Sequence, residues 1–191
     1  LIRTLSYDPA EAGRLLDLAG WRAGPNGARR RSGLALTVDL LVPSSSTTRR
    51  QLAEGIQQLW KQVGIEATIT AVDFPVFQER LAKGQFDAMV GAWLDNPSPR
   101  NLGNQWTREG FGGLNYSRYH NPVFDSLFRI ASSAHTLTAG RSIWREALDT
   151  LNVDAPAIFL YTPTNVAVVS RRVSGLSIDP FCREGCCAPS P

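Results

Sequence analysis

Between residues 34 and 93 the sequence alternates three strand-like segments with two helix-like segments. "LALTVDLLV" and "IEATITA" alternate apolar residues with smaller or polar ones, as a half-buried strand does. "FDAMVGAW" is apolar on both faces except for Asp87, which predicts a strand inside the sheet. The first helix of this region has one apolar stripe, formed by Leu52, Ile56, Leu59 and Val63. This order predicts two strand–helix–strand units with a parallel sheet and right-handed crossovers, which is an α/β fold.

A further helix is predicted before this region. Asp8 is placed to cap it, Gly20 to end it in a left-handed conformation, and Trp21 to fold back on Leu16. Residues 22–33, "RAGPNGARRRSG", are predicted to form turn and loop.

After the second strand, a helix is predicted from a cap at Asp73 to a stop at Gly84. The second half of the chain begins with a region rich in glycine, asparagine and tryptophan at residues 94–120. Two helices are predicted after it, at 121–134 and 138–155, followed by two short strands at 157–163 and 166–170.

Length and composition exclude several classes of protein. With 191 residues and 43% hydrophobic content, the chain can form one sizeable core, or a core with a smaller appendage. The net charge of +3 is carried almost entirely by arginine, in short scattered clusters that fit a solvated surface better than a nucleic-acid interface. No apolar run approaches the roughly 18 residues of a membrane span, and the first residues lack the layout of a secretory signal. We therefore expect a soluble chain that can still be the mature piece of an exported protein.

Catalytic and metal-binding patterns find little support in the sequence. It has no nucleophile elbow, phosphate loop or dinucleotide-binding glycines, and His120 and His135 are predicted to lie on the surface. Cys182, Cys186 and Cys187 are one ligand short of a zinc site, so a local disulfide and free thiols both remain open. We expect no enzyme activity, no metal and no cofactor.

A binding site is predicted where the parallel strands end. The third strand delivers Trp93, Asp95 and Asn96 to the carboxyl edge of the sheet, and the first strand delivers Ser44 and Ser45 to the same edge. An aromatic wall, a carboxylate, an amide and hydroxyls can together hold a small polar or cationic solute.

Each of these residues also has a plainer structural interpretation. Trp93 can be a core aromatic at a strand end, and Asp95-Asn96 can cap a helix after Pro97. The serines at 44–46 can simply begin the next helix. Pattern alone therefore predicts an α/β domain with a candidate ligand edge.

Five phrases in order resemble one protein family. They are "YDPAEAGRLLDLAGW", "RRQLAEGIQQLWKQVGIEATI", "FQERLAKGQFDAMVGAWLDNPSP", "GLNYSRYHNPVFDSLF" and "VDAPAIFLYTPTNVAVVSRRVSGL". Over about residues 6–180 the chain resembles the carboxy-terminal lobe of solute-binding protein family 5, the dipeptide-, oligopeptide- and nickel-binding receptors of bacterial ABC importers. We accordingly divide the chain into a lobe, residues 1–181, and a flexible Cys/Pro-containing tail, residues 182–191.

The resemblance implies one half of a two-lobe, type II periplasmic-binding-protein fold that closes over its solute. The implied partners are a peptide-like solute, an amino-terminal lobe of the same receptor that this chain lacks, and ABC permease subunits. The implied location is the periplasmic or extracellular face of the cytoplasmic membrane, with membrane association only through the permease or an absent lipid anchor. The same lobe can alternatively serve as the ligand sensor of a regulator.

In peptide-binding members of the family, an aspartate in the Trp…Asp passage holds the amino terminus of the ligand. Asp95 matches that position, and Trp93 and Asn96 are its neighbours. Dipeptide-binding members also have an arginine in the loop after the first strand, but here that loop has none before Arg49. A longer peptide, an amino-modified sugar or another cation-bearing solute therefore stays open.

Overall fold

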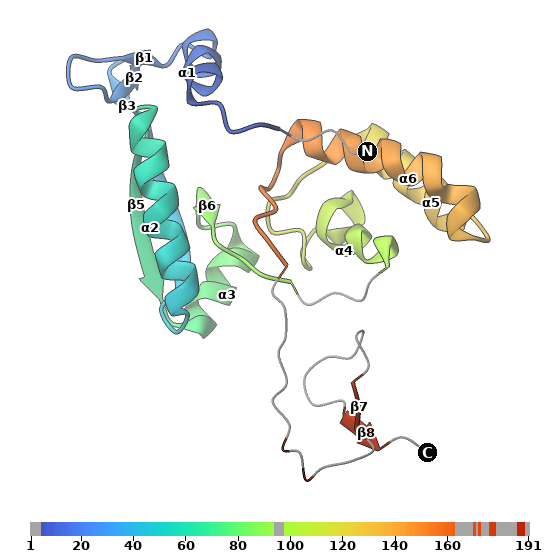
Figure 1. The fold of residues 1–191 in the computed structure, drawn as a ribbon. Helices are drawn as coiled ribbons and strands as arrows, with labels where there is room; N and C mark the ends of the chain where they lie inside the picture. The colour runs from blue at the N-terminus through green and yellow to red at the C-terminus, as the bar shows by residue number, and fades with distance from the viewer. Residues whose placement is uncertain are drawn as a thin grey trace.

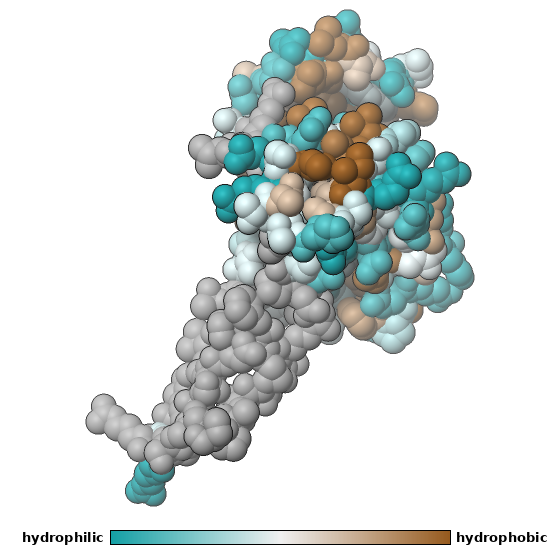
Figure 2. All heavy atoms as spheres, turned by 90° about the vertical axis from the view of Figure 1, so that its right-hand side faces the viewer, coloured by the Kyte–Doolittle hydropathy of each residue, from teal (hydrophilic) through white to brown (hydrophobic). Residues whose placement is uncertain are grey.

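The computed structural model describes residues 5–93 and 98–162, together with 170, 172, 176–178 and 187–189. These residues form a small antiparallel sheet with one helix, a parallel sheet flanked by two helices, a helical region and a two-stranded ribbon (Figure 1). On the face shown in Figure 2, polar side chains surround patches of apolar ones.

The parallel sheet has the strand order β5–β4–β6, with β4 at Thr37–Pro43, β5 at Glu66–Val72 and β6 at Ala88–Met89. β4 pairs with β5 along its whole length and with β6 at Leu40↔Ala88 and Leu41↔Met89. The parallel strands and α/β class are as predicted. The expectation that the third strand lies inside the sheet is wrong within the described residues, because β4 is central and β6 is at the edge.

The two faces of β4 pack against different helices. Leu40 and Val42 pack with Ala53 of α2 (Thr47–Gln62), whereas Leu41 packs with Phe77 and Leu81 of α3 (Phe74–Lys83). The predicted half-exposed alternation of 34–42 is therefore wrong for the end of β4, where four consecutive residues are buried. The stripe predicted on α2 also shifts, since Leu59 is exposed and Trp60 packs against the core.

Three helices end in the same backbone motif, with a glycine at positive φ. At the end of α1 (Pro9–Leu18), the Trp21 N–H donates to the Leu16 oxygen at 2.9 Å, which confirms the predicted fold-back. Gly64 and Gly84 end α2 and α3 in the same way. The Asp8 carboxylate accepts from the Glu11 N–H, as expected of the α1 cap.

Residues 22–35 form a three-stranded antiparallel sheet rather than the predicted turn and loop. Its strands are β1 (Arg22–Ala23), β2 (Arg29–Arg31) and β3 (Leu34–Ala35). Ser32 and Gly33, both at positive φ, make the two-residue turn between β2 and β3. Such short, arginine-rich strands lack the apolar alternation by which a strand is usually recognised.

The second half of the described chain is helical. Its elements are η1 (Pro99–Asn101), α4 (Leu102–Trp106), η2 (Arg108–Gly110), α5 (Pro122–Ser133) and α6 (Leu137–Asp154). Trp106, Phe124, Ala147 and Leu151 form its buried core. The two long helices confirm the prediction for 121–134 and 138–155. No helix among the described residues is long and apolar enough to cross a membrane.

The carboxy-terminal segment differs from its prediction. Residues 157–162 form no strand, so the strand predicted at 157–163 is wrong where the structure describes it, and most of 166–170 lies outside the described residues. β7 (Leu176–Ile178) pairs antiparallel with β8 (Cys187–Pro189). Cys182 and Cys186 lie outside the described residues, and the division at residue 181 stays a prediction.

Candidate functional site

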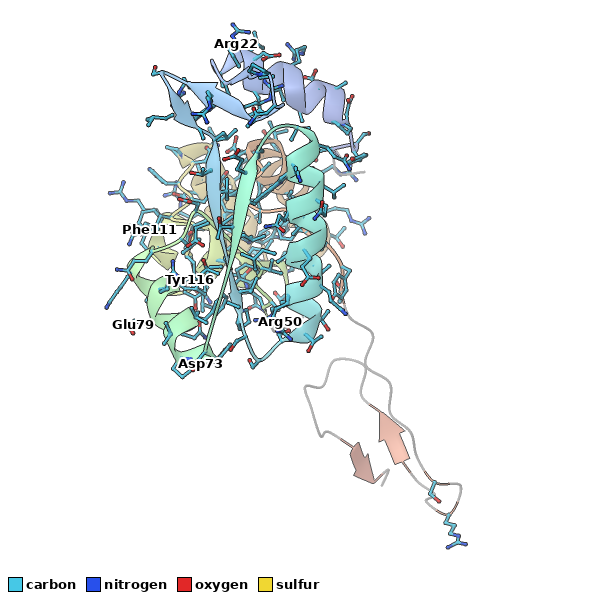
Figure 3. The ribbon with its side chains drawn as sticks, turned by 90° about the vertical axis from the view of Figure 1, so that its left-hand side faces the viewer. Arg22, Arg50, Asp73, Glu79, Phe111 and Tyr116 are labelled. Atoms are coloured by element: carbon cyan, nitrogen blue, oxygen red, sulfur yellow. The ribbon has the colours of Figure 1, made fainter. Side chains whose placement is uncertain are left out.

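The carboxyl ends of the three parallel strands lie together at one edge of the sheet. Asp73, which follows β5, marks this edge in Figure 3, and Arg22 of the small sheet lies at the opposite end of the molecule. The pairing Pro43↔Val72 brings the ends of β4 and β5 side by side. The edge therefore has the position at which open parallel sheets bind their ligands.

Ser44 joins the ends of β4 and β5. Its N–H donates to the Val72 oxygen at 2.7 Å, and its hydroxyl donates to Asp73 Oδ1 at 3.1 Å. Ser45, the next residue, is exposed. Ser46 caps α2 by accepting from the Arg49 N–H at 3.3 Å. The helix-start interpretation thus holds for Ser46, while Ser44 and Ser45 lie at the predicted edge.

Asp73 is a carboxylate at this edge that the sequence indicated only as a helix cap. It occupies the N-cap position of α3, but its side chain makes no capping hydrogen bond there and instead accepts from Ser44. The signal that could have revealed this pair is the register of the parallel strands, because it places the residues after Pro43 and Val72 next to each other.

Trp93, at the exit of the third strand, is half-buried against Trp106. Their ring centroids are 5.9 Å apart, and Trp106 in turn contacts Phe159 edge-on at 5.8 Å. The indole N–H groups of Trp93 and Trp106 are buried and have no acceptor within the described part of the chain. This packing fits the core-aromatic interpretation of Trp93, and its predicted contact with solute stays a prediction.

Asp95 and Asn96 fall in residues 94–97, which lie outside the described residues. Their predicted roles in ligand binding therefore stay predictions. The structure fixes both ends of this short stretch, through Trp93 before it and through Ser98, whose hydroxyl accepts from the Arg100 N–H at 3.4 Å.

A buried asparagine organises the loop between η2 and α5. The Asn115 amide donates to the oxygens of Thr107 and Tyr119, both at 2.9 Å, and its own oxygen accepts from the Tyr119 N–H and the Ser117 hydroxyl. Arg118 extends from the same loop and donates to the Lys83 oxygen at the end of α3. The bond of Arg118 to Lys83 connects this loop of the helical region to the α/β unit.

Asp154 at the end of α6 receives hydrogen bonds from Tyr119 Oη at 2.7 Å and Asn121 Nδ2 at 2.6 Å. These two bonds lower the pKa of the Asp154 carboxyl. Burial, reinforced by Asp154, raises the pKa of the Tyr119 hydroxyl. The cluster is a structural clamp between the loop and α6.

Two shallow depressions of similar size lie away from the sheet edge. One of about 360 Å³ lies on α6 and is lined by Glu146, Asp149, Thr150, Val153 and Asp154. The other, of about 320 Å³, lies between α2 and the start of β5 and is lined by Gln57, Gln58, Lys61, Ile65, Glu66 and Ala67. The described residues contain no group of three or more histidines, cysteines or carboxylates able to hold a metal ion. His120 and His135 are exposed, as predicted.

Comparison with known proteins identifies the family. The model of bacterial extracellular solute-binding proteins, family 5, middle region, matches residues 2–113, more than half of the chain. The chain belongs to this family. It is 26% identical over 185 residues to the dipeptide-binding protein of Pseudomonas aeruginosa, covering 96% of this chain and 33% of that protein.

Solved structures agree on the fold. AppA of Bacillus subtilis, in complex with a nonapeptide, matches 82% of this family 5 chain with a TM-score of 0.72 and 22% identity. NikZ of Campylobacter jejuni, in complex with Ni(L-His), matches 82% with a TM-score of 0.74 and 20% identity. Each match covers 32% of the solved chain, so this chain spans about a third of the length of the relatives it matches.

These findings confirm several expectations from the sequence. The fold is that of one lobe of a type II periplasmic binding protein, and the family consists of extracellular solute-binding proteins rather than enzymes. The family is described as extracellular, which agrees with the expected location outside the bacterial cytoplasm. The relatives named above are binding proteins and give no support to the regulatory alternative.

Proposed function

We propose that this family 5 chain is one wall of the receptor of an ABC importer, and that the receptor captures a peptide or a related amine-bearing solute. The observation that carries the proposal is that β4 and β5 end side by side at one edge of the parallel sheet, where Ser44 and Ser45 follow. Family membership supports a solute-binding use of that edge. One relative is a dipeptide-binding protein, and two others were solved in complex with a nonapeptide and with Ni(L-His), which favours a ligand with amino-acid chemistry.

Each predicted site residue has a chemical role in this proposal. Asp95 accepts charge-assisted hydrogen bonds from the ligand ammonium group, and Trp93 supplies an aromatic wall. Asn96, Ser44 and Ser45 offer neutral hydrogen bonds to the backbone of the ligand. The hydrogen bonds of Ser44 to Val72 and Asp73 support this arrangement, since they hold one side of the edge in place before a ligand arrives.

An exposed apolar segment supports the need for a second lobe. Ile158, Phe159, Leu160 and Tyr161 are consecutive and are 77%, 62%, 49% and 60% exposed. Four adjacent large apolar side chains in water are unfavourable, so such a surface normally has a cover. We assign that cover to the amino-terminal lobe of the same receptor, because the chain spans only about a third of its relatives.

Binding then proceeds by closure of the two lobes. A ligand that contacts both walls favours the closed state by its differential affinity, and the closed receptor meets the permease. One wall alone covers much less of a solute than a closed cleft does. The isolated chain should therefore bind far more weakly than the complete receptor.

Calorimetry on the complete receptor tests this function. Small molecules that co-purify with it are identified by mass spectrometry, and the best candidate is titrated into the receptor and into the 191-residue chain. We expect tight binding to the receptor, at least 100-fold weaker binding to the chain, and loss of binding when the ligand amine is acetylated. Equal affinity for both proteins, or for the acetylated ligand, would contradict the proposal.

A further inference from the structure

The outer edge of β5 has no strand beside it. In the part of the chain that the structure describes, β5 pairs only with β4 and ends the sheet order β5–β4–β6. Figure 3 shows this edge facing the viewer, with α2 along one side of it. The strand has seven residues and contains no proline and, after Glu66, no charged residue. Natural proteins usually protect an edge strand with such residues, so an unprotected one is suited to pairing with another strand.

The register fixes which backbone groups of β5 are bonded to β4. The Glu66 N–H donates to the Leu36 oxygen at 2.9 Å, and the Val72 oxygen accepts from the Ser44 N–H at 2.7 Å. In a parallel ladder every second residue directs both its N–H and its C=O to the same neighbouring strand. The even-numbered residues of β5 are therefore the ones bonded to β4.

The odd-numbered residues of β5 point their backbone groups away from the sheet. They are Ala67, Ile69 and Ala71. The Gln57 side chain of α2 confirms this orientation, because its Nε2 donates to the outward Ala67 oxygen at 2.7 Å. A carbonyl oxygen can accept a second hydrogen bond, so this contact leaves the edge able to pair with a strand.

Two opposite charges lie on the side of α2 that borders this edge. Gln57, Gln58 and Lys61 line the depression beside the start of β5, and Glu54 lies one turn before the glutamines on the same side of the helix. Glu54 and Lys61 are exposed, and neither forms an ion pair with another described residue. Their spacing is about 10 Å along the helix axis, too far for them to pair with each other.

We propose that two copies of this chain associate through their β5 strands, antiparallel across a two-fold axis near Thr68. The outward groups of Ala67 and Ile69 in one copy then bond those of Ile69 and Ala67 in the other. Thr68 lies opposite its own counterpart and Glu66 lies opposite Thr70, so the ladder brings no like charges together. The two parallel sheets become one.

The charges of α2 favour a second copy as the partner. α2 packs on both β4 and β5. Because neighbouring strands are about 4.8 Å apart, the two α2 helices of the dimer lie about 10 Å apart, an ordinary packing distance for helices. Gln57, between Glu54 and Lys61, bonds Ala67 next to the axis, so the axis passes between the two charges. Glu54 of each copy then faces Lys61 of the other.

Sedimentation velocity of the complete receptor over a range of concentrations tests the proposal. Ala67→Pro removes an outward N–H and breaks no bond to β4. Lys61→Glu makes like charges face each other across the axis, and the double variant with Glu54→Lys exchanges the two charges. The matched control is Lys83→Glu, the same charge change on α3, where Lys83 pairs with Glu79 away from β5 (Figure 3).

We expect a concentration-dependent equilibrium between monomer and dimer. Ala67→Pro and Lys61→Glu should each raise the dissociation constant of the dimer by roughly 10-fold or more, because every dimer holds two copies of each contact. The charge-exchanged double variant and the Lys83→Glu control should both dimerise like the wild type.

Three results would overturn the proposal. They are a receptor that stays monomeric at every concentration, a dimer that Ala67→Pro leaves unchanged, and a charge exchange that does not restore dimerisation. The second result would assign the dimer to another surface.

Hydrogen exchange identifies any other occupant of the edge. The Ala67 and Ile69 amides should exchange rapidly in the dilute monomer and slowly in the dimer. Slow exchange in the monomer would assign the edge to another part of the receptor, which would also overturn the proposal.

A solute titration separates this proposal from the proposed function. Ala67 lies near the start of β5, away from the carboxyl edge, so Ala67→Pro should leave the affinity for solute unchanged. A receptor that dimerises but binds no solute would contradict only the proposed function.

Discussion

Arg29 is predicted to be the most important single side chain for holding α1 and the small sheet on the parallel sheet. It is 8% exposed, although it carries a full charge. Its Nε donates to the Val63 oxygen at 2.8 Å, and its Nη1 donates to Asp17 Oδ1 and to the Trp21 oxygen, both at 2.7 Å. One guanidinium thus joins the ends of α1 and α2 to β2.

Arg29→Met keeps most of the side-chain volume and removes every donor. Leaving two carbonyl acceptors without a partner costs on the order of 1 kcal/mol each. The Asp17 side chain is 44% exposed, so water can solvate its carboxylate once Arg29 is replaced. The loss of this ion pair therefore costs less stability than the loss of a buried pair would. We expect the free energy of unfolding to fall by about 2–3 kcal/mol.

Urea denaturation of the complete receptor measures the change, with Arg30→Met as control because Arg30 neighbours Arg29 and is exposed. With a slope of about 2 kcal/mol per molar urea, the midpoint of Arg29→Met should fall by about 1–1.5 M. The control should stay within about 0.3 M of the wild type. Equal midpoints for the two variants would refute the assigned role of Arg29.

Two further predictions concern backbone strain and pH. Gly64 is at positive φ, and an added Cβ would overlap the Gly27 oxygen, so Gly64→Ala should lower the unfolding free energy by at least about 2 kcal/mol. Gly55 lies inside α2 with open space around it, so Gly55→Ala should raise the unfolding free energy by about 0.5–1 kcal/mol. Equal destabilisation by Gly64→Ala and Gly55→Ala would contradict this account. The Tyr119 pKa is raised in the folded state, so its contribution to stability is present below the ordinary value of 10.0 and falls as pH rises above it. Thermal melts from pH 8 to 11 should therefore show a smaller decline for Tyr119→Phe than for the wild type, and parallel curves would contradict the assignment.

Elements with long, regular patterns could be predicted from the sequence. The three glycine-terminated helices, the parallel pairing of β4 with β5 and the two helices of the second half all follow from caps, stops and apolar spacing. The position of β6 could not be predicted, because the apolar pattern of a strand does not tell whether the strand is central or at the edge of its sheet. The small sheet was missed because its strands have only two or three residues.

The candidate site was predictable as an edge but not as a set of contacts. The topology of a parallel sheet places the residues after each strand at one edge, which predicted the positions of Ser44 and Ser45, while the use of that edge by a ligand stays a prediction. The Ser44–Asp73 hydrogen bond depends on strand register, and the packing of Trp93 on Trp106 depends on tertiary contacts between segments. Neither is encoded in a local pattern, so neither could be found without the fold.

The central claim is that the carboxyl edge is a solute-binding wall in which Asp95 holds an amine. Isothermal titration of the co-purified solute into the complete receptor tests it, with Asp95→Asn compared to Asp8→Asn. The control makes the same charge change at the α1 cap, where asparagine caps equally well. Asp95→Asn should weaken binding by about 1.5–3 kcal/mol, roughly 10- to 150-fold, with no change for Asp8→Asn. Unchanged affinity of Asp95→Asn would contradict the claim.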